Sequence, residues 1–70
     1  MKEMDKLRIL IPHWITHNEE HADEFRKWVI QAGEAAPEIL AAVDRTAQVN
    51  EALEAALEKL GGALDYHPGE

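Results

Sequence analysis

The chain contains no cysteine, which excludes disulfide bonds and metal sites built on thiolates. A metal ion bound to this protein must therefore be held by imidazole and carboxylate groups. The sequence also lacks any apolar run near the ~20 residues that a membrane helix needs. Its N-terminal stretch LRILI is shorter than the apolar core of a signal peptide, which has about 7–15 residues. We expect no membrane partner and a cytoplasmic location.

Basic residues are scarce, since 7 Lys and Arg stand against 14 Asp and Glu and give a net charge of −7. This negative charge repels nucleic acid, so we expect no nucleic-acid partner. The sequence has no glycine-rich phosphate loop and no Ser/His/Asp set, so we expect a non-enzymatic protein. A chain of 70 residues buries only about 60% of its unfolded surface, so its core is marginal without a metal or a partner.

Two stretches of the sequence have the a/d spacing of a heptad repeat, which favours helices over strands. In the first stretch the residues at this spacing are Ile11, Trp14, Asn18, His21, Phe25, Trp28 and Ala32. In the second they are Ile39, Val43, Thr46, Asn50, Leu53, Leu57 and Leu60. The spacing predicts helices over 12–32 and 37–60.

Proline and glycine agree with these boundaries. Pro12 and Pro37 suit the first turn of a helix, because proline has no N–H to donate within the helix interior. Gly33 and the pair Gly61-Gly62 suit positions just after a helix end. The segment 1–11 is then expected to be an N-terminal arm and 61–70 a C-terminal tail.

The short connection GEAAP predicts two antiparallel helices, so the fold class is an all-α two-helix hairpin in a single domain. Folding the chain about residue 35 or 36 places His21 opposite Asn50. Trp14, Phe25 and Trp28 then fall on the seam and are predicted to be core residues. A buried polar layer that fixes the register is expected from Asn18, His21 and Asn50.

Further apolar residues lie beside both seams. They are Ile15, Ala22 and Val29 in the first stretch, and Leu40, Ala47, Val49 and Ala56 in the second. A lone hairpin would leave these rows in water. We therefore expect a homodimer that forms a four-helix bundle, or docking onto a larger protein partner. The alternative is a third layer supplied by the ends of the chain.

Three of the four histidines recur at intervals of four, which places them on one side of a helix. A pair of histidines at i and i+4 can chelate one divalent ion, and nickel, cobalt and zinc suit nitrogen ligands. The predicted metal ligands are His13, His17, His21, Glu20 and Glu24. Two alternatives remain open, in which His21 is a structural residue of the polar layer and His13 is a solvated residue at the helix start.

Two other sites are compatible with the same residues. A tetrapyrrole held between aromatic side chains, with a histidine as axial ligand, is the alternative cofactor. Residues 17–21 also match H-x-x-E-H, the signature of inverted zinc proteases. Such enzymes need a distant third ligand and a large cleft, which a 70-residue hairpin does not supply, so we do not predict a protease.

The stretch LRILIPHWITHNEEHADEFRKWV, followed by VNEALEAALEKLGG, resembles a small prokaryotic family without a settled activity. Its members carry PHW-x-x-H-N-x-x-H-x-x-x-F near the start, and the likeness covers roughly residues 7 to 62. The matching residues are Pro12, His13, Trp14, His17, Asn18, His21 and Phe25. The resemblance implies a helical domain associated with metal and tetrapyrrole proteins, and it favours nickel or cobalt.

Taken together, these patterns lead to one functional interpretation and one alternative. The interpretation is a metal-handling or accessory module that binds a divalent transition metal, or a metal-bearing cofactor, through the histidines. The alternative is a structural or interaction subunit that docks on a larger complex. In that alternative His21 and Asn50 form a buried polar layer that sets specificity.

Overall fold

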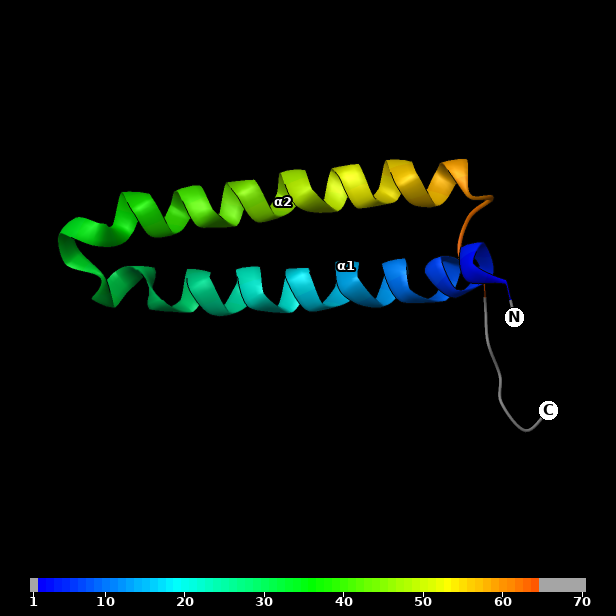
Figure 1. Ribbon diagram of the computed structural model, residues 1–70. Coiled ribbons are helices and arrows are strands. Elements are labelled where there is room, and N and C mark those ends of the chain that lie inside the picture. The colour runs from blue at the N-terminus through cyan, green and yellow to red at the C-terminus, as the bar shows by residue number, and fades with distance from the viewer. Residues whose placement is uncertain (1, 65–70) are drawn as a thin grey trace, which may run out of the picture.

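The fold is an antiparallel hairpin of two long helices, α1 (Glu3–Trp28) and α2 (Ala36–Lys59), as predicted (Figure 1). The structure is a computed structural model, and it describes residues 2–64. Two short 3₁₀ turns, η1 (Val29–Gln31) and η2 (Gly33–Ala35), join the helices. Most of the tail predicted at 61–70 lies outside the described residues, as does Met1.

The N-terminal segment is helical from Glu3, so the prediction of an arm over 1–11 is wrong. Pro12 lies inside α1 and cannot supply the N–H that would bond the carbonyl of Arg8. That carbonyl instead accepts the backbone N–H of Leu64 at 3.1 Å. The Arg8 side chain donates in turn to the carbonyls of Gly62, at 2.8 Å, and Gly61, at 3.2 Å. These bonds hold the segment after α2 against α1 and satisfy the group that proline leaves free.

The chain reverses at Gly33, whose φ of 57° lies in the left-handed region that favours glycine. The helix α1 ends at Trp28, four residues before the predicted end at 32, and α2 begins one residue before the predicted 37. Asn18 pairs with Asn50, so the centre of the reversal is residue (18 + 50)/2 = 34. The pairing of the two helices is therefore shifted from the one predicted about residue 35 or 36.

The interior of the hairpin is small and uses a different row of α1 from the predicted one. The hydrophobic residues buried within the described chain are Ile11, Ala22 and Val43. The predicted core residues lie at its edge instead, because the exposed fractions are 42% for Trp14, 37% for Phe25 and 58% for Trp28. The small side chain of Ala22 allows the helices to approach closely, and the bulky aromatic rings are directed outward.

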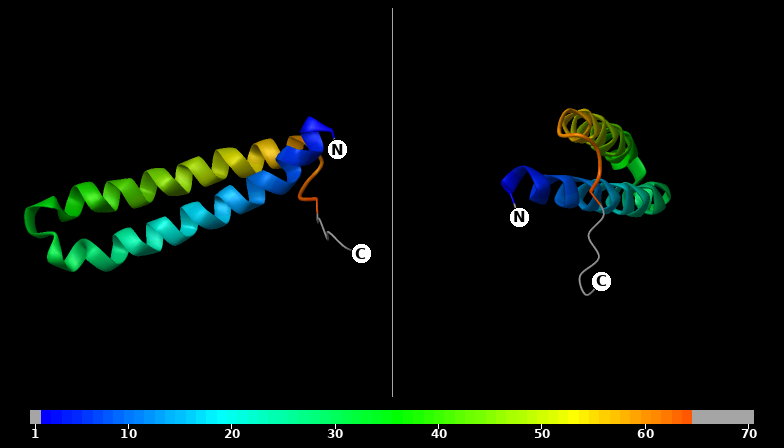
Figure 2. Two further views of the ribbon diagram at one scale, coloured as in Figure 1. Left: turned by 60° about the horizontal axis from the view of Figure 1, so that its bottom comes forward. Right: turned by 90° about the vertical axis from the view of Figure 1, so that its right-hand side faces the viewer.

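The described chain forms a single layer of helices. Its extents are 49 × 26 × 13 Å, so its thickness is close to the 10–12 Å diameter of one helix. The two views of Figure 2 show α2 lying along α1, and within residues 2–64 no third helix covers either side of the pair. Neither helix has an apolar stretch that would take it across a bilayer, within the residues described.

Candidate metal site

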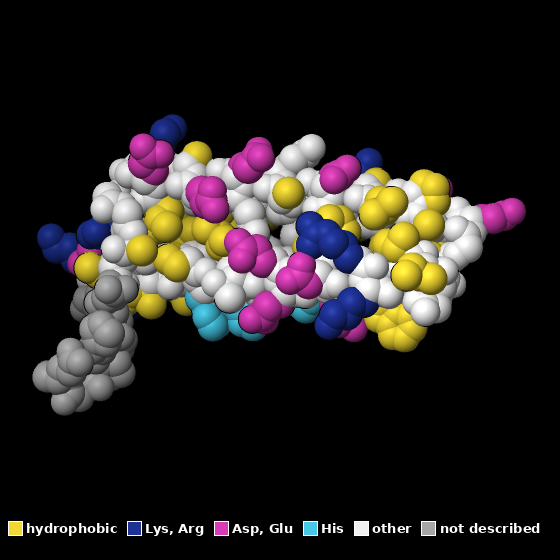
Figure 3. Space-filling model, turned by 180° about the vertical axis from the view of Figure 1, so that it is seen from behind, with side chains coloured by type: hydrophobic (Ala, Val, Ile, Leu, Met, Phe, Trp, Pro, Cys, Tyr) yellow, Lys and Arg dark blue, Asp and Glu magenta, His cyan; other side chains and the backbone are white. Residues whose placement is uncertain are grey.

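The imidazoles of His13 and His17 form a close pair on the surface of α1. Their Nε2 atoms are 3.1 Å apart, and their ring centroids are 4.5 Å apart with the planes inclined by 72°. Both side chains are exposed. In Figure 3 the histidines lie along the edge of the molecule formed by α1.

The spacing of the two Nε2 atoms suits neighbouring positions around a single metal ion. With metal–nitrogen bonds of about 2.05 Å, nitrogens 3.1 Å apart subtend an angle of about 98° at the ion. This value falls between the ligand angle of an octahedral site, about 90°, and that of a tetrahedral site, about 109°. Without a metal, the Nε2–H of one imidazole donates to the Nε2 of the other. The lone pair that accepts this hydrogen bond is the one that would bind a metal ion.

The other predicted ligands do not join this pair. His21 is exposed, and its ring stacks beside that of Phe25 with centroids 6.4 Å apart. The carboxylate of Glu24 accepts a hydrogen bond from the indole N–H of Trp28 at 3.2 Å. Glu20 is exposed on the same helix. Within residues 2–64, no three side chains among His, Asp and Glu are gathered closely enough to hold a metal ion.

The polar layer of the interior consists of two asparagines and excludes His21. The Nδ2 of Asn18 donates to the Oδ1 of Asn50 at 2.9 Å, and the Nδ2 of Asn50 donates to the carbonyl of Ile15 at 3.3 Å. Asn50 is 8% exposed and Asn18 is half-buried. The prediction that His21 faces Asn50 is wrong, because the shifted pairing brings Asn18 to that level. Asn18 and Asn50 keep their predicted place in the layer.

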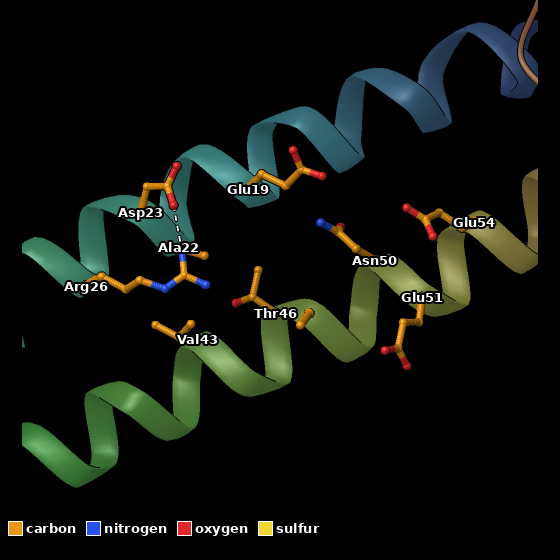
Figure 4. A pocket seen from close by; sticks show the side chains of 10 residues that line it. Glu19, Ala22, Asp23, Arg26, Val43, Thr46, Asn50, Glu51 and Glu54 are labelled. Carbon is orange, nitrogen blue, oxygen red and sulfur yellow. Dashed lines mark hydrogen bonds and ion pairs between the residues drawn. The ribbon is translucent and has the colours of Figure 1, made fainter.

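A groove on one side of the hairpin is lined mainly by polar and charged residues of both helices (Figure 4). Its lining residues are Glu19, Ala22, Asp23, Arg26, Val43, Thr46, Ala47, Asn50, Glu51 and Glu54. The guanidinium of Arg26 pairs with the carboxylate of Asp23 at 2.6 Å. The histidine pair does not line this groove, so Glu54, which does, is not placed to complete a shell around His13 and His17.

The exposed aromatic residues are the feature that sequence reasoning misplaced. Phe25 and Trp28 of α1 line a shallow apolar pocket with Ile39 and Ala42 of α2. The signal that pointed to this arrangement was the second apolar row of α1, Ile15, Ala22 and Val29. That row has the same seven-residue period as the row through Trp14 and Phe25, and the structure places it against α2.

A comparison with protein families identifies the chain. A family model described as a domain of unknown function (DUF8180) matches residues 7–60. The chain therefore belongs to this family. No curated protein matches the chain, and no solved structure does. The match spans α1 from Leu7 onward and all of α2, so it includes both the histidine pair and the asparagine layer.

Proposed function

We propose that this member of a family of unknown function is a non-enzymatic metal-handling module that binds one divalent nickel, cobalt or zinc ion through His13 and His17. The observation that carries the proposal is the 3.1 Å separation of their Nε2 atoms on an exposed helix surface. Imidazole nitrogen suits all three metals, and the chain has no thiolate to compete with it.

The number of protein ligands favours transient binding over a structural role. A structural zinc site has four protein ligands, whereas the histidine pair supplies two. Water, or a donor from another molecule, then occupies the remaining positions. An ion held in this way is weakly bound and accessible from solvent, which is suited to receiving a metal and passing it on.

The proposal is tested by titrating the protein, purified without a histidine tag, with nickel, cobalt and zinc salts in a calorimeter. We expect one ion per histidine pair, and a loss of affinity of about tenfold or more in His13→Ala and in His17→Ala. His21→Ala is the matched control, because His21 is an exposed histidine on the same helix and stands apart from the pair. It should bind as the unmodified chain does.

Two results would overturn the proposal. One is binding that is unchanged in the His13→Ala/His17→Ala double variant. The other is a titration of the unmodified chain that shows no binding of any of the three metals. Because both side chains are exposed, the double variant is expected to keep its helical circular dichroism, so loss of binding is distinguishable from loss of fold.

A further inference from the structure

One broad face of the hairpin carries large aromatic side chains of α1 that nothing in the described chain covers. Trp14, Phe25 and Trp28 expose 42%, 37% and 58% of their surface. An aromatic side chain has about 150–250 Å² to bury, so these three leave roughly 300 Å² in water. Leu7 and Leu10 of the same helix, which are 36% and 41% exposed, add further apolar surface to this row.

The helix α2 supplies smaller side chains to the same face. Ile39 and Ala42 line an apolar pocket with Phe25 and Trp28, which shows that the two rows lie on one side of the hairpin. From Ala42 the row continues along α2 at intervals of 7-4-3-4. Its members are Ala42, Val49, Leu53, Ala56 and Leu60. This spacing is that of a helix surface that packs against another helix.

The opposite face carries charged side chains. The groove there is lined by four carboxylates and one guanidinium, from Glu19, Asp23, Glu51, Glu54 and Arg26. Figure 4 shows these side chains on the two helices that border the groove. A net charge of −7 opposes association of two copies through a charged surface. Contact through the aromatic face keeps the groove charges away from the interface, so this obstacle is reduced.

We propose that a second copy of this chain covers the aromatic face, so that two hairpins form a four-helix bundle. Domains are built from at least two packed layers, and this chain forms one layer 13 Å thick. In a two-fold symmetric dimer, the aromatic row of α1 packs against the row of smaller side chains on α2 of the partner. The symmetry makes the contact between α2 of the first copy and α1 of the partner identical. The face is therefore complementary to itself, which is what a homodimer requires.

The size of the face matches what a stable dimer needs. The 24 residues of α2 extend about 36 Å at 1.5 Å per residue, and two adjacent helices are about 20 Å wide. The face thus covers roughly 700 Å², close to the about 800 Å² that each partner contributes to a standard interface. Of the metal pair, His13 lies beside this face, about 100° around α1 from Trp14, whereas His17 lies at its border, about 60° from Trp14.

The proposal is tested by measuring the absolute mass of the full chain in solution by sedimentation equilibrium or light scattering. The chain has a mass of 7.9 kDa, so we expect a species of 2 × 7.9 = 15.8 kDa at micromolar concentration. The double variant Phe25→Lys/Trp28→Lys should raise the dimer dissociation constant by about tenfold or more. The matched control is Leu40→Lys, because Leu40 is 48% exposed and lies about 100° around α2 from Ile39, on the side away from the aromatic face.

Each outcome of this experiment decides the question. A chain that stays at 7.9 kDa up to millimolar concentration overturns the proposal, and a larger protein partner then becomes the occupant of the face. A dimer that survives Phe25→Lys/Trp28→Lys also overturns it, as does one that is lost in Leu40→Lys. The His13→Ala/His17→Ala variant should still dimerise, so failure of the metal proposal is separable from failure of this one.

Helicity gives a second measurement that does not depend on a variant. If the dimer interface supplies much of the buried core, dilution should lower the helical circular dichroism and shift the fluorescence of Trp14 and Trp28 to longer wavelength in parallel with the mass. Helicity and fluorescence that do not change over a dilution range in which the mass halves would contradict burial of the tryptophans at the interface.

Discussion

The backbone N–H of Leu64 donates to the carbonyl of Arg8 at 3.1 Å, and this bond takes the place of the intrahelical bond that Pro12 cannot make. The segment after α2 is thus attached to α1 at the carbonyl that Pro12 leaves without an intrahelical donor. Figure 1 shows this segment descending from the end of α2 to the N-terminal part of α1. The Arg8 side chain strengthens the contact through Gly61 and Gly62.

The first prediction concerns Pro12. Pro12→Ala restores the N–H that bonds the carbonyl of Arg8 and removes the clash of the proline ring with that carbonyl. We expect the free energy of unfolding to rise by up to about 3 kcal/mol in chemical denaturation. Hydrogen exchange at the Leu64 amide should become faster, because the carbonyl of Arg8 would also accept the new N–H of residue 12. An amide at Leu64 that is as protected as in the unmodified chain would show that the two bonds do not compete.

The second prediction concerns the asparagine layer. Asn50→Leu removes the acceptor of Asn18 and leaves that half-buried amide unpaired. The free energy of unfolding should fall by about 1–3 kcal/mol. Gln48→Ala is the control, because Gln48 is exposed on the same helix as Asn50, and its effect should stay within about 0.5 kcal/mol.

The Asn18→Leu/Asn50→Leu double variant completes the comparison. Replacing both amides with apolar side chains leaves neither side-chain amide unpaired, so the double variant should be more stable than Asn50→Leu alone. If the losses of the two single variants instead simply add in the double variant, the side chains do not depend on one another, and the observed hydrogen bond is of no consequence for stability.

The third prediction concerns the turn at Gly33. Its φ of 57° is strained for residues with a β-carbon, although a β-carbon built there has no neighbour within 4 Å. Gly33→Ala should therefore destabilise the hairpin by about 1 kcal/mol through backbone strain alone. Gly33→Asn should cost less, because asparagine tolerates the left-handed region better than alanine does. Thermal unfolding of the two variants side by side measures the difference, and equal midpoints would contradict this explanation.

The fourth prediction concerns pH. Metal binding needs the lone pairs of both His13 and His17, and a proton on either imidazole removes one of them. The affinity for nickel should therefore be greatest at neutral to alkaline pH and fall as the pH is lowered, with protons released on binding. Titrations in buffers of different ionisation enthalpy count the released protons. Affinity that does not change as the solution is acidified would indicate that carboxylates bind the ion, in place of imidazoles.

The local features of the fold could be read from the sequence. The heptad spacing gave both helices, and the turn at Gly33 and the helix end before Gly61 follow from the conformational freedom of glycine. The register in which α1 pairs with α2 could not be predicted from the sequence. Two rows of α1 share Ile11 and Asn18, and one row continues through Trp14 and Phe25 whereas the other continues through Ala22. Both rows are apolar with a helical period, so periodicity alone does not choose between them.

Part of the candidate site could also be predicted from the sequence, because it depends only on local helix geometry. That His13 and His17 lie one turn apart follows from their spacing in any helix, so the sequence by itself determined that they are neighbours. The sequence did not determine that His21 lies outside the interior polar layer, because this depends on the pairing of α1 with α2 that puts Asn18 opposite Asn50.

What the sequence determined is therefore the local part of the structure: two helices, the turn between them and a pair of adjacent imidazoles, all set by interactions within a few residues. The tertiary structure decided which side of α1 faces α2 and whether a helix can continue through Pro12. Both depend on groups more than 30 residues away in the chain, the amide of Asn50 for Asn18 and that of Leu64 for Arg8. Such partners are set by close packing and by the need to pair buried polar groups, neither of which acts within a single segment.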